Sequence, residues 1–176
     1  MALNDVKNAY GTPATVACAT LNLASDTNLL AGRESALVDN TSNLYEDYIL
    51  SGYITVGNTP TINKWIEVWC YGILDDPSSP TYPVNLAGSD AAVTLSNDGA
   101  KQAGLVLAKT IMLTVTTSYF KYPIGSISVK SLFGGSLPRK FGFFITHNTA
   151  VNLANTTPES TYHQLAVTPV YRTVAS

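Results

Sequence analysis

The sequence has 176 residues, is rich in apolar side chains and is poor in charged ones. Hydrophobic residues make up 45% and charged residues 12% of the chain, and the formal net charge is -2, whereas an average protein has about 25% charged residues. Because the basic residues form no run, we expect no nucleic-acid partner. Surface charge opposes association between proteins, and this chain has little of it. We therefore expect other subunits to cover part of its surface.

The ends and the apolar stretches of the chain give no sign of targeting to a membrane. Asn4 and Asp5 stand where a secretory signal would have a basic region and then an apolar run. The longest apolar-leaning stretch, residues 104–115, is interrupted by Lys109 and is shorter than the roughly 18 residues of a transmembrane helix. We therefore expect synthesis in the cytoplasm and no membrane partner.

The chain divides into a short arm and one domain. Residues 1–11 are mostly polar and have too little apolar content to pack by themselves, so they are expected to form an N-terminal arm that is either frayed or ordered by a neighbouring subunit. Residues 12–176 are long enough for a single domain with a substantial core.

Seven or eight extended segments follow the arm, separated mostly by Gly, Pro, Asn and Asp. The sequence predicts strands within residues 12–23, 45–56, 64–74, 91–95, 104–116, 119–133, 139–147 and 162–171. Long polar connections, residues 24–43 and 75–90, separate some of them, and no amphipathic helix of ten or more residues is expected.

This pattern of strands predicts an all-β fold. Short strands without alternating helices are typical of an antiparallel β-sandwich or barrel. The long connections favour a jelly roll with about eight strands, and an immunoglobulin-like sandwich is the alternative.

Side chains with catalytic or metal-binding potential are few and are not arranged in a known motif. His147 and His163 could form a metal pair only if their strands were neighbours, and no third ligand has a suitable spacing. Asp75 and Asp76 are adjacent in a Pro-Ser loop, which is typical of a solvated turn rather than of paired glycosidase carboxylates.

Other motifs also fail to indicate an enzyme. The Gly-Gly-Ser sequence at residues 134–136 lacks the Lys-Ser/Thr ending of a phosphate-binding loop, and no nucleophile elbow occurs. Cys18 and Cys70 lie far apart in the sequence and are expected to be buried, reduced thiols. We therefore expect no enzymatic activity, no cofactor and no metal.

The segment 64–74, KWIEVWCYGIL, is the most distinctive strand of the chain. Alternation places Ile66, Val68 and Cys70 on one side. The other side carries aromatic rings and one carboxylate, namely Trp65, Glu67, Trp69 and Tyr71. This second side is predicted to contact a partner, with stacking on sugars or burial inside the chain as alternatives.

Four more charged residues, in a chain with few charges, are candidates for pairing across the same kind of interface. They are Arg33, Glu34, Arg139 and Lys140. The alternative for each of them is an ordinary solvated loop charge.

Three segments resemble small virion structural proteins of tailed bacteriophages. They are GRESALVDNTSNLYEDYILSGYITVGNTPTINKWIEVWCYG (residues 32–72), YPIGSISVKSLFGGSLPRKFGFFITHNTAVNL (residues 122–153) and AVTPVY (residues 166–171). The resemblance implies a jelly-roll capsid decoration, or cement, protein. Such a protein sits on the lattice of the major capsid protein as a homodimer or homotrimer and stabilises the phage head.

A second functional class remains open at this point. The same aromatic side chains and the Asn-rich and Asp-rich loops would suit a phage fibre, a tail component or another carbohydrate-binding module that recognises a receptor. Both classes are non-enzymatic, and the first places the protein on the capsid surface of the virion.

Overall fold

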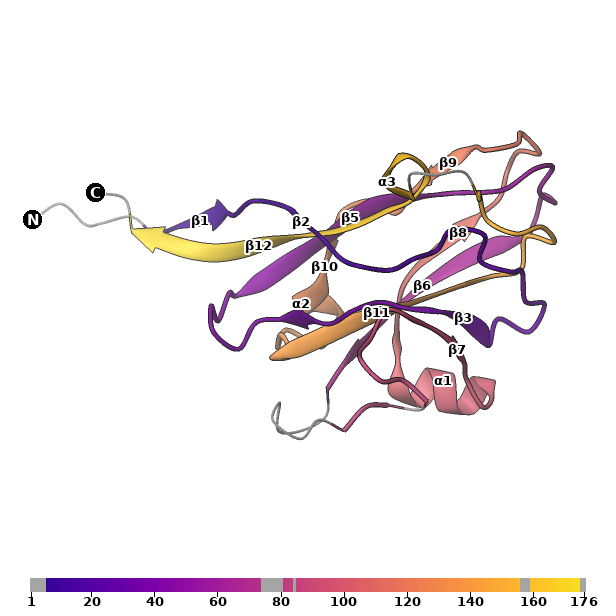
Figure 1. Cartoon of the computed structure of the whole chain (residues 1–176). Helices are drawn as coiled ribbons and strands as arrows, with labels where there is room; N and C mark the ends of the chain where they lie inside the picture. The colour runs from indigo at the N-terminus through magenta and orange to yellow at the C-terminus, as the bar shows by residue number, and fades with distance from the viewer. Residues whose placement is uncertain (1–5, 74–80, 84, 156–158, 175–176) are drawn as a thin grey trace, which may run out of the picture.

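The computed structural model describes residues 6–73, 81–83, 85–155 and 159–174. Within these residues, two antiparallel sheets pack face to face (Figure 1). The prediction of an all-β, antiparallel sandwich is confirmed. Asp75 and Asp76 lie outside the described residues, as do the first five residues of the expected arm.

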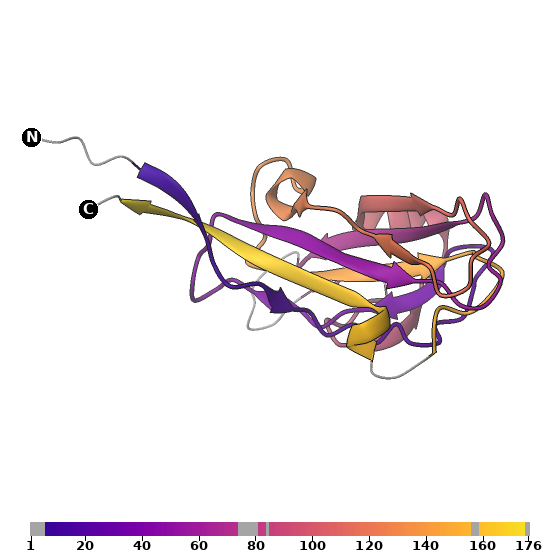
Figure 2. The same ribbon diagram turned by 90° about the horizontal axis from the view of Figure 1, so that it is seen from above.

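The first sheet has the strand order β1-β12-β5-β10, with β2 also paired to β12 and β9 also paired to β5. Its strands are β1 (Val6–Tyr10), β2 (Ala14–Thr15), β5 (Asp47–Thr55), β9 (Lys121–Pro123), β10 (Ile127–Ser128) and β12 (Gln164–Val174). The end of β12 and its partner β1 continue beyond the sandwich as a two-stranded ribbon (Figures 1 and 2).

The second sheet has the strand order β7-β3-β11-β6-β8, with β4 also paired to β11. Its strands are β3 (Ala31–Glu34), β4 (Val38–Asp39), β6 (Trp65–Gly72), β7 (Ala91–Thr94), β8 (Val106–Met112) and β11 (Lys140–His147). Three short helices complete the described fold, α1 (Asp98–Gly104), α2 (Val129–Leu132) and α3 (Glu159–Tyr162).

The pairing of the strands is that of a jelly roll. Eight strands form the jelly roll when β1 and β2 count as the first, and β7 is an additional edge strand that pairs with β3. The first strand pairs with the last (β12), and the second (β3 with β4) pairs with the seventh (β11). The third (β5) pairs with the sixth (β9 with β10), and the fourth (β6) pairs with the fifth (β8). This nested order has the long connections of two Greek keys, and it differs from the order of an immunoglobulin sandwich, ABED with CFG.

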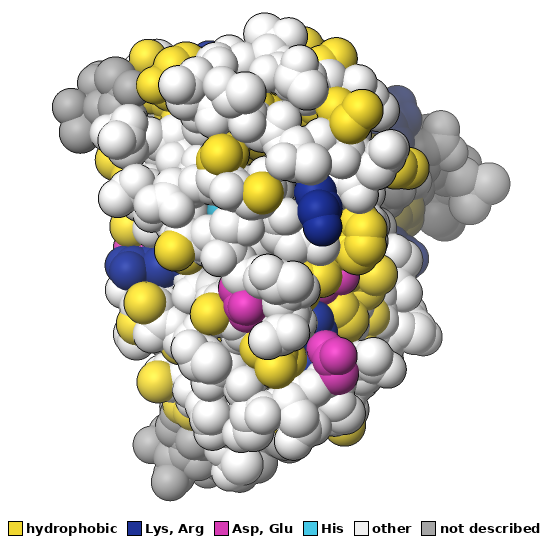
Figure 3. Space-filling view, turned by 90° about the vertical axis from the view of Figure 1, so that its right-hand side faces the viewer, with side chains coloured by type: hydrophobic (Ala, Val, Ile, Leu, Met, Phe, Trp, Pro, Cys, Tyr) yellow, Lys and Arg dark blue, Asp and Glu magenta, His cyan; other side chains and the backbone are white. Residues whose placement is uncertain are grey.

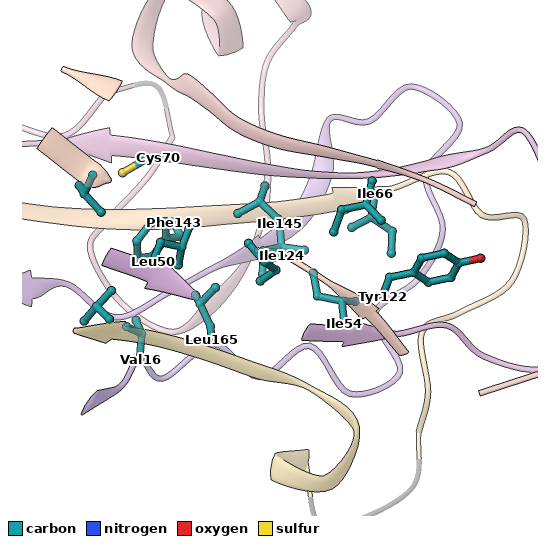
Figure 4. Packing of buried hydrophobic residues seen from close by; sticks show 14 of the residues in the cluster. Val16, Leu50, Ile54, Ile66, Cys70, Tyr122, Ile124, Phe143, Ile145 and Leu165 are labelled. Atoms are coloured by element: carbon teal, nitrogen blue, oxygen red, sulfur yellow. The ribbon is translucent and has the colours of Figure 1, made fainter. Parts of the chain in front are cut away.

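The main core lies between the two sheets. Side chains from both sheets, among them Leu50, Ile66, Phe143 and Leu165, point toward one another there and are almost completely buried (Figure 4). The predicted inner side of β6, formed by Ile66, Val68 and Cys70, belongs to this core. Burial of these side chains between the sheets is what holds the two layers together.

A second, smaller core lies on the outer face of the second sheet. Trp69 and Tyr71 from β6 and Phe144 from β11 pack there against Leu86, Leu95 and Leu105. These leucines lie in the part of the chain that leads from β6 through β7 and α1 to β8. The chain's own long connection therefore covers the part of the outer face around Trp69, Tyr71 and Phe144.

The structure differs from three of the expected segments. Residues 24–43, expected as a link, contain β3 and β4, whereas only two residues of the expected strand 12–23 are paired, as β2. Residues 119–133 form two short strands and α2 in place of one strand. Ser128 begins α2 because its hydroxyl accepts a hydrogen bond from the Ser131 N–H, a cap that competes with continued pairing.

Candidate partner-binding surfaces

The aromatic side of β6 is divided between the interior and the surface. Tyr71 is fully buried and Trp69 nearly so, both in the outer core, whereas Trp65 is 36% exposed. The expectation that Trp69 and Tyr71 lie on a surface is wrong, because the connection between β6 and β8 folds back over them. Of the three aromatic rings, Trp65 alone is available to a partner or a sugar.

Glu34 is likewise not on the surface. Its carboxylate is fully buried and accepts hydrogen bonds from the Tyr71 hydroxyl at 2.7 Å, from the Ala87 N–H at 3.0 Å and from the Gly88 N–H. Burial and this carboxylate raise the pKa of Tyr71 far above its usual value, so the phenol keeps its proton and donates it. Glu34 therefore ties the segment at Ala87 and Gly88 to the sheet, and its expected place in an interface is wrong.

Glu67 is part of a charged cluster beneath α1. Its Oε2 accepts from Trp69 Nε1 at 2.8 Å and from the buried Lys101 Nζ at 3.2 Å. Lys101 also donates to the Leu29 carbonyl at 3.0 Å and lies 3.4 Å from Asp98 Oδ1, and its ammonium is 5.0 Å from the centre of the Trp69 ring. Two hydrogen bonds and two carboxylates thus surround the ammonium, which offsets the cost of burying its charge.

The cluster stands in a hollow that is open to solvent. Polar and apolar side chains line it together, including Asn28, Trp69, Asn97, Lys101, Gln102 and Leu107. Figure 3 views the molecule from the end at which α1 lies, and it shows acidic and basic side chains close together beside hydrophobic ones. The contacts of Glu67 and Lys101 lie within the chain, so the cluster is first of all a structural element that holds α1 on the sheet.

Replacing Lys101 by methionine is expected to lower the free energy of unfolding by about 2 kcal/mol. The change keeps most of the side-chain volume but leaves the Leu29 carbonyl and part of the Glu67 carboxylate without their donor. Denaturant unfolding measures the effect. The matched control is Lys109→Met on β8, an exposed position that should change stability by less than about 0.5 kcal/mol. Equal effects at the two positions would contradict a structural role for the cluster.

The remaining charged candidates make contacts within the chain or are exposed. Arg33 Nε lies 2.6 Å from Asp90 Oδ1, and Lys140 Nζ lies 3.0 Å from Asp39 Oδ2. Arg139 is exposed. Contact of Trp65, Glu67, Arg33, Arg139 and Lys140 with a partner stays a prediction.

One group of exposed apolar side chains lies at the start of β6 and the end of β8. Trp65 stands directly opposite Met112 in the register, and Met112 is 58% exposed. Ile62 is exposed in the preceding turn, where the Asn63 N–H bonds to the Leu113 carbonyl and so keeps the turn beside β8. We call Ile62, Trp65 and Met112 the β6–β8 patch.

A second group lies at the opposite end of the molecule, on the ribbon formed by β1 and the end of β12 (Figure 2). Val6, Tyr10 and Val174 are 61%, 66% and 56% exposed. The register places Val6 opposite Val174 and Tyr10 opposite Val170, so all four side chains share one face of the ribbon. An isolated two-stranded ribbon has only marginal stability in water, so further contacts would stabilise this one.

The sequence could not have singled out these residues. Val6 and Tyr10 stand in the segment interpreted as a polar arm, and Met112 alternates with threonines on the less apolar side of its strand. The only available signal was their size and apolar character.

The two histidines have structural contacts. The Thr55 N–H donates to His163 Nδ1 at 3.3 Å, which leaves Nε2 to donate to the Ala154 carbonyl at 3.1 Å. His147 lies 3.0 Å from the Leu23 carbonyl through Nε2 and 3.0 Å from Thr149 Oγ1 through Nδ1. Within the described ranges, no group of three or more His, Cys, Asp or Glu side chains is placed to hold a metal ion.

The cysteines are also separate. No disulfide joins Cys18 and Cys70, and burial raises the pKa of the Cys70 thiol. Cys18 lines a hollow of about 240 Å³ beside β12, together with Val16, Leu165 and His163. None of the helices in the described part of the chain has the length and apolar character required to cross a bilayer.

Comparison with protein-family models, with curated proteins and with solved structures found no significant match to this chain. The fold places the chain in the class of antiparallel jelly-roll sandwiches, and exposed apolar groups lie at its two ends.

Proposed function

We propose that the chain is a non-enzymatic virion structural protein that binds the lattice of the major capsid protein as a decoration, or cement, protein on the capsid surface. The observation that carries the proposal is the position of the exposed apolar groups. The β6–β8 patch and the ribbon lie at opposite ends of the molecule, so one protein can contact two neighbours at once.

Two further features support an assembly role. The jelly roll is a fold that viral capsid proteins use repeatedly, although fold alone does not define function. The described surface carries few charges, as Figure 3 illustrates for one end, which favours association. On a symmetric shell, many weak contacts of this kind would add up to strong attachment and would clamp neighbouring subunits together.

The capsid role is tested with expanded, undecorated shells made of the major capsid protein of the same virus. The purified chain is expected to sediment with the shells at a saturable ratio and to raise the temperature at which filled particles release DNA. If the chain neither sediments with the shells nor changes the release temperature at any salt concentration, the proposal is wrong.

Trp65→Ala is expected to weaken shell binding at least tenfold. A partly exposed tryptophan beside Met112 has the composition and position of an interface hot spot, whereas its loss from the chain alone should change stability by less than about 1 kcal/mol. Binding isotherms and thermal unfolding are measured on the same protein. Lys109→Ala is the control, since Lys109 stands opposite Val68 and so belongs to the other side of β8.

The alternative class, a fibre, tail or carbohydrate-binding module, has less support. Stacking on sugar rings requires accessible aromatic faces, and Trp69 and Tyr71 are buried. A glycan array separates the two proposals, because specific binding that is lost in Trp65→Ala would favour the alternative and would count against the capsid role.

A further inference from the structure

The ribbon presents an open edge as well as an apolar face. Within the described residues, β1 pairs on one side only, with β12, and it is the outermost strand of its sheet. Figures 1 and 2 show β1 projecting away from the sandwich, so that the body of the molecule does not cover this edge. An exposed strand edge is a template for pairing with another chain.

The hydrogen bonds of the ribbon define which main-chain groups face outward. The Gly11 N–H donates to the Pro169 carbonyl at 2.9 Å, so at Gly11 the main chain faces β12. In an antiparallel pair the direction alternates along the strand, so Lys7 and Ala9 also face β12. The N–H and C=O groups of Val6, Asn8 and Tyr10 consequently point away from the ribbon.

We propose that the β1 strands of two copies of this chain pair antiparallel across a twofold axis at Asn8. In this register Asn8 stands opposite Asn8 of the second copy, and Val6 stands opposite Tyr10 of the second copy. All three outward-facing residues then exchange main-chain hydrogen bonds with their mates. The β1-containing sheets of two molecules become one continuous sheet.

Side-chain chemistry selects this register among its neighbours. It joins a β-branched residue with an aromatic ring, a favourable cross-strand pair, and places Lys7 opposite Ala9 of the second copy. An axis at Lys7 would put two ammonium groups directly opposite each other, and an axis at Ala9 would leave Val6 without a mate in β1. The register at Asn8 also covers Val6 and Tyr10, the most exposed apolar side chains of the ribbon.

The occupant is a second copy because the strand is complementary to itself. Across a twofold axis the same surface of both copies must be complementary to itself. The pairs Val6 with Tyr10 and Lys7 with Ala9 meet this requirement, because each forms twice without a steric or charge conflict. This pairing specifies the self-association that the proposed capsid role includes. Its test needs no capsid, so the pairing and the capsid role can fail separately.

Asn8→Pro tests the pairing by removing the outward N–H. Proline is tolerated in an edge strand when the lost N–H faces solvent, so the monomer should keep its fold and its far-ultraviolet circular dichroism. Sedimentation equilibrium is expected to show a dimer for the unchanged chain and for the control Asn8→Ser, and a dissociation constant at least tenfold weaker for Asn8→Pro. A chain that is monomeric at its highest soluble concentration would overturn the proposal.

Cross-linking tests the register itself, in a Cys18→Ser background. Two cysteines at position 8 would have Cα atoms about 5.5 Å apart, within disulfide range, whereas two at position 9 would be about 8 Å apart. Asn8→Cys is therefore expected to form a covalent dimer under mild oxidation, and the matched variant Ala9→Cys is not. Equal rates for the two variants, or faster cross-linking at position 9, would overturn the register.

Discussion

Replacing Glu34 by alanine is expected to lower the free energy of unfolding by about 4 kcal/mol. The substitution leaves the Tyr71 hydroxyl and the main-chain N–H groups of Ala87 and Gly88 without their acceptor in a buried site. Each unsatisfied donor costs about 1 to 3 kcal/mol, and hydrogen bonds to a charged group are among the stronger ones. Thermal and denaturant unfolding measure the loss.

Two matched variants separate the contributions. Tyr71→Phe removes one donor and keeps the ring in the outer core, so a loss of about 1 to 2 kcal/mol is expected. Glu34→Gln keeps an acceptor but brings an amide group toward the N–H donors. Its loss of stability should lie between the losses in Tyr71→Phe and Glu34→Ala. Hydrogen exchange at Ala87 and Gly88 should accelerate in both Glu34 variants, and unchanged exchange would contradict the anchoring role of the carboxylate.

Stability is expected to fall as the pH falls from about 6.5 to 4, because of His147. Burial lowers the pKa of His147 from 6.5 to about 4, with His163 nearby lowering it further, while the Leu23 carbonyl and Asp26 act in the opposite direction. The unfolded chain therefore binds a proton at a higher pH than the folded chain does. The resulting loss of stability reaches about 3 kcal/mol at the lower end of this range.

The variant His147→Gln tests the assignment. Its free energy of unfolding should depend much less on pH between 6.5 and 4 than that of the unchanged chain, although its stability near neutral pH will be lower. Asp26 and Asp39 also have lowered pKa values. Burial acts to raise the pKa of Asp26, but main-chain N–H donors including Ala31 together outweigh it. The pKa of Asp39 is lowered chiefly by hydrogen bonds from Thr41. Protonation of these two carboxylates lowers the free energy of unfolding further as the pH falls toward and below the usual pKa of an aspartate. This further loss is expected in the unchanged chain and in His147→Gln alike.

Periodicity predicted the sandwich correctly because each strand must bury one side. The inner side of β6 could be identified from alternation alone, and residues 139–147 contain β11 with Phe141, Phe143 and Ile145 in the core, as their spacing indicates. Alternation alone would place Leu107 on the same side of β8 as Ile111, and here it fails. The register with β6 shifts between Val68 and Trp69, and this irregularity places Leu107 on the outer face.

Tertiary contacts also override the local signal of residues 31–34. Residues 31–34, AGRE, have little strand propensity, yet they pair with β7 and β11. A side chain at Gly32 would collide with the Ile145 carbonyl and the Phe144 ring, so the glycine is required by neighbours that are distant in the sequence. The segment therefore resembles a loop in composition although its environment makes it a strand.

The sequence by itself determined the all-β class, the main core and the two-sided character of segment 64–74, because these depend on alternation within each strand. Only the tertiary structure decided what covers the aromatic side. The connection between β6 and β8 folds back and buries Trp69 and Tyr71, and Glu34, Lys101 and the leucines of the outer core hold it there. That arrangement depends on contacts between residues far apart in the chain, which leave Trp65 exposed beside Met112 as the part of the strand available to a partner.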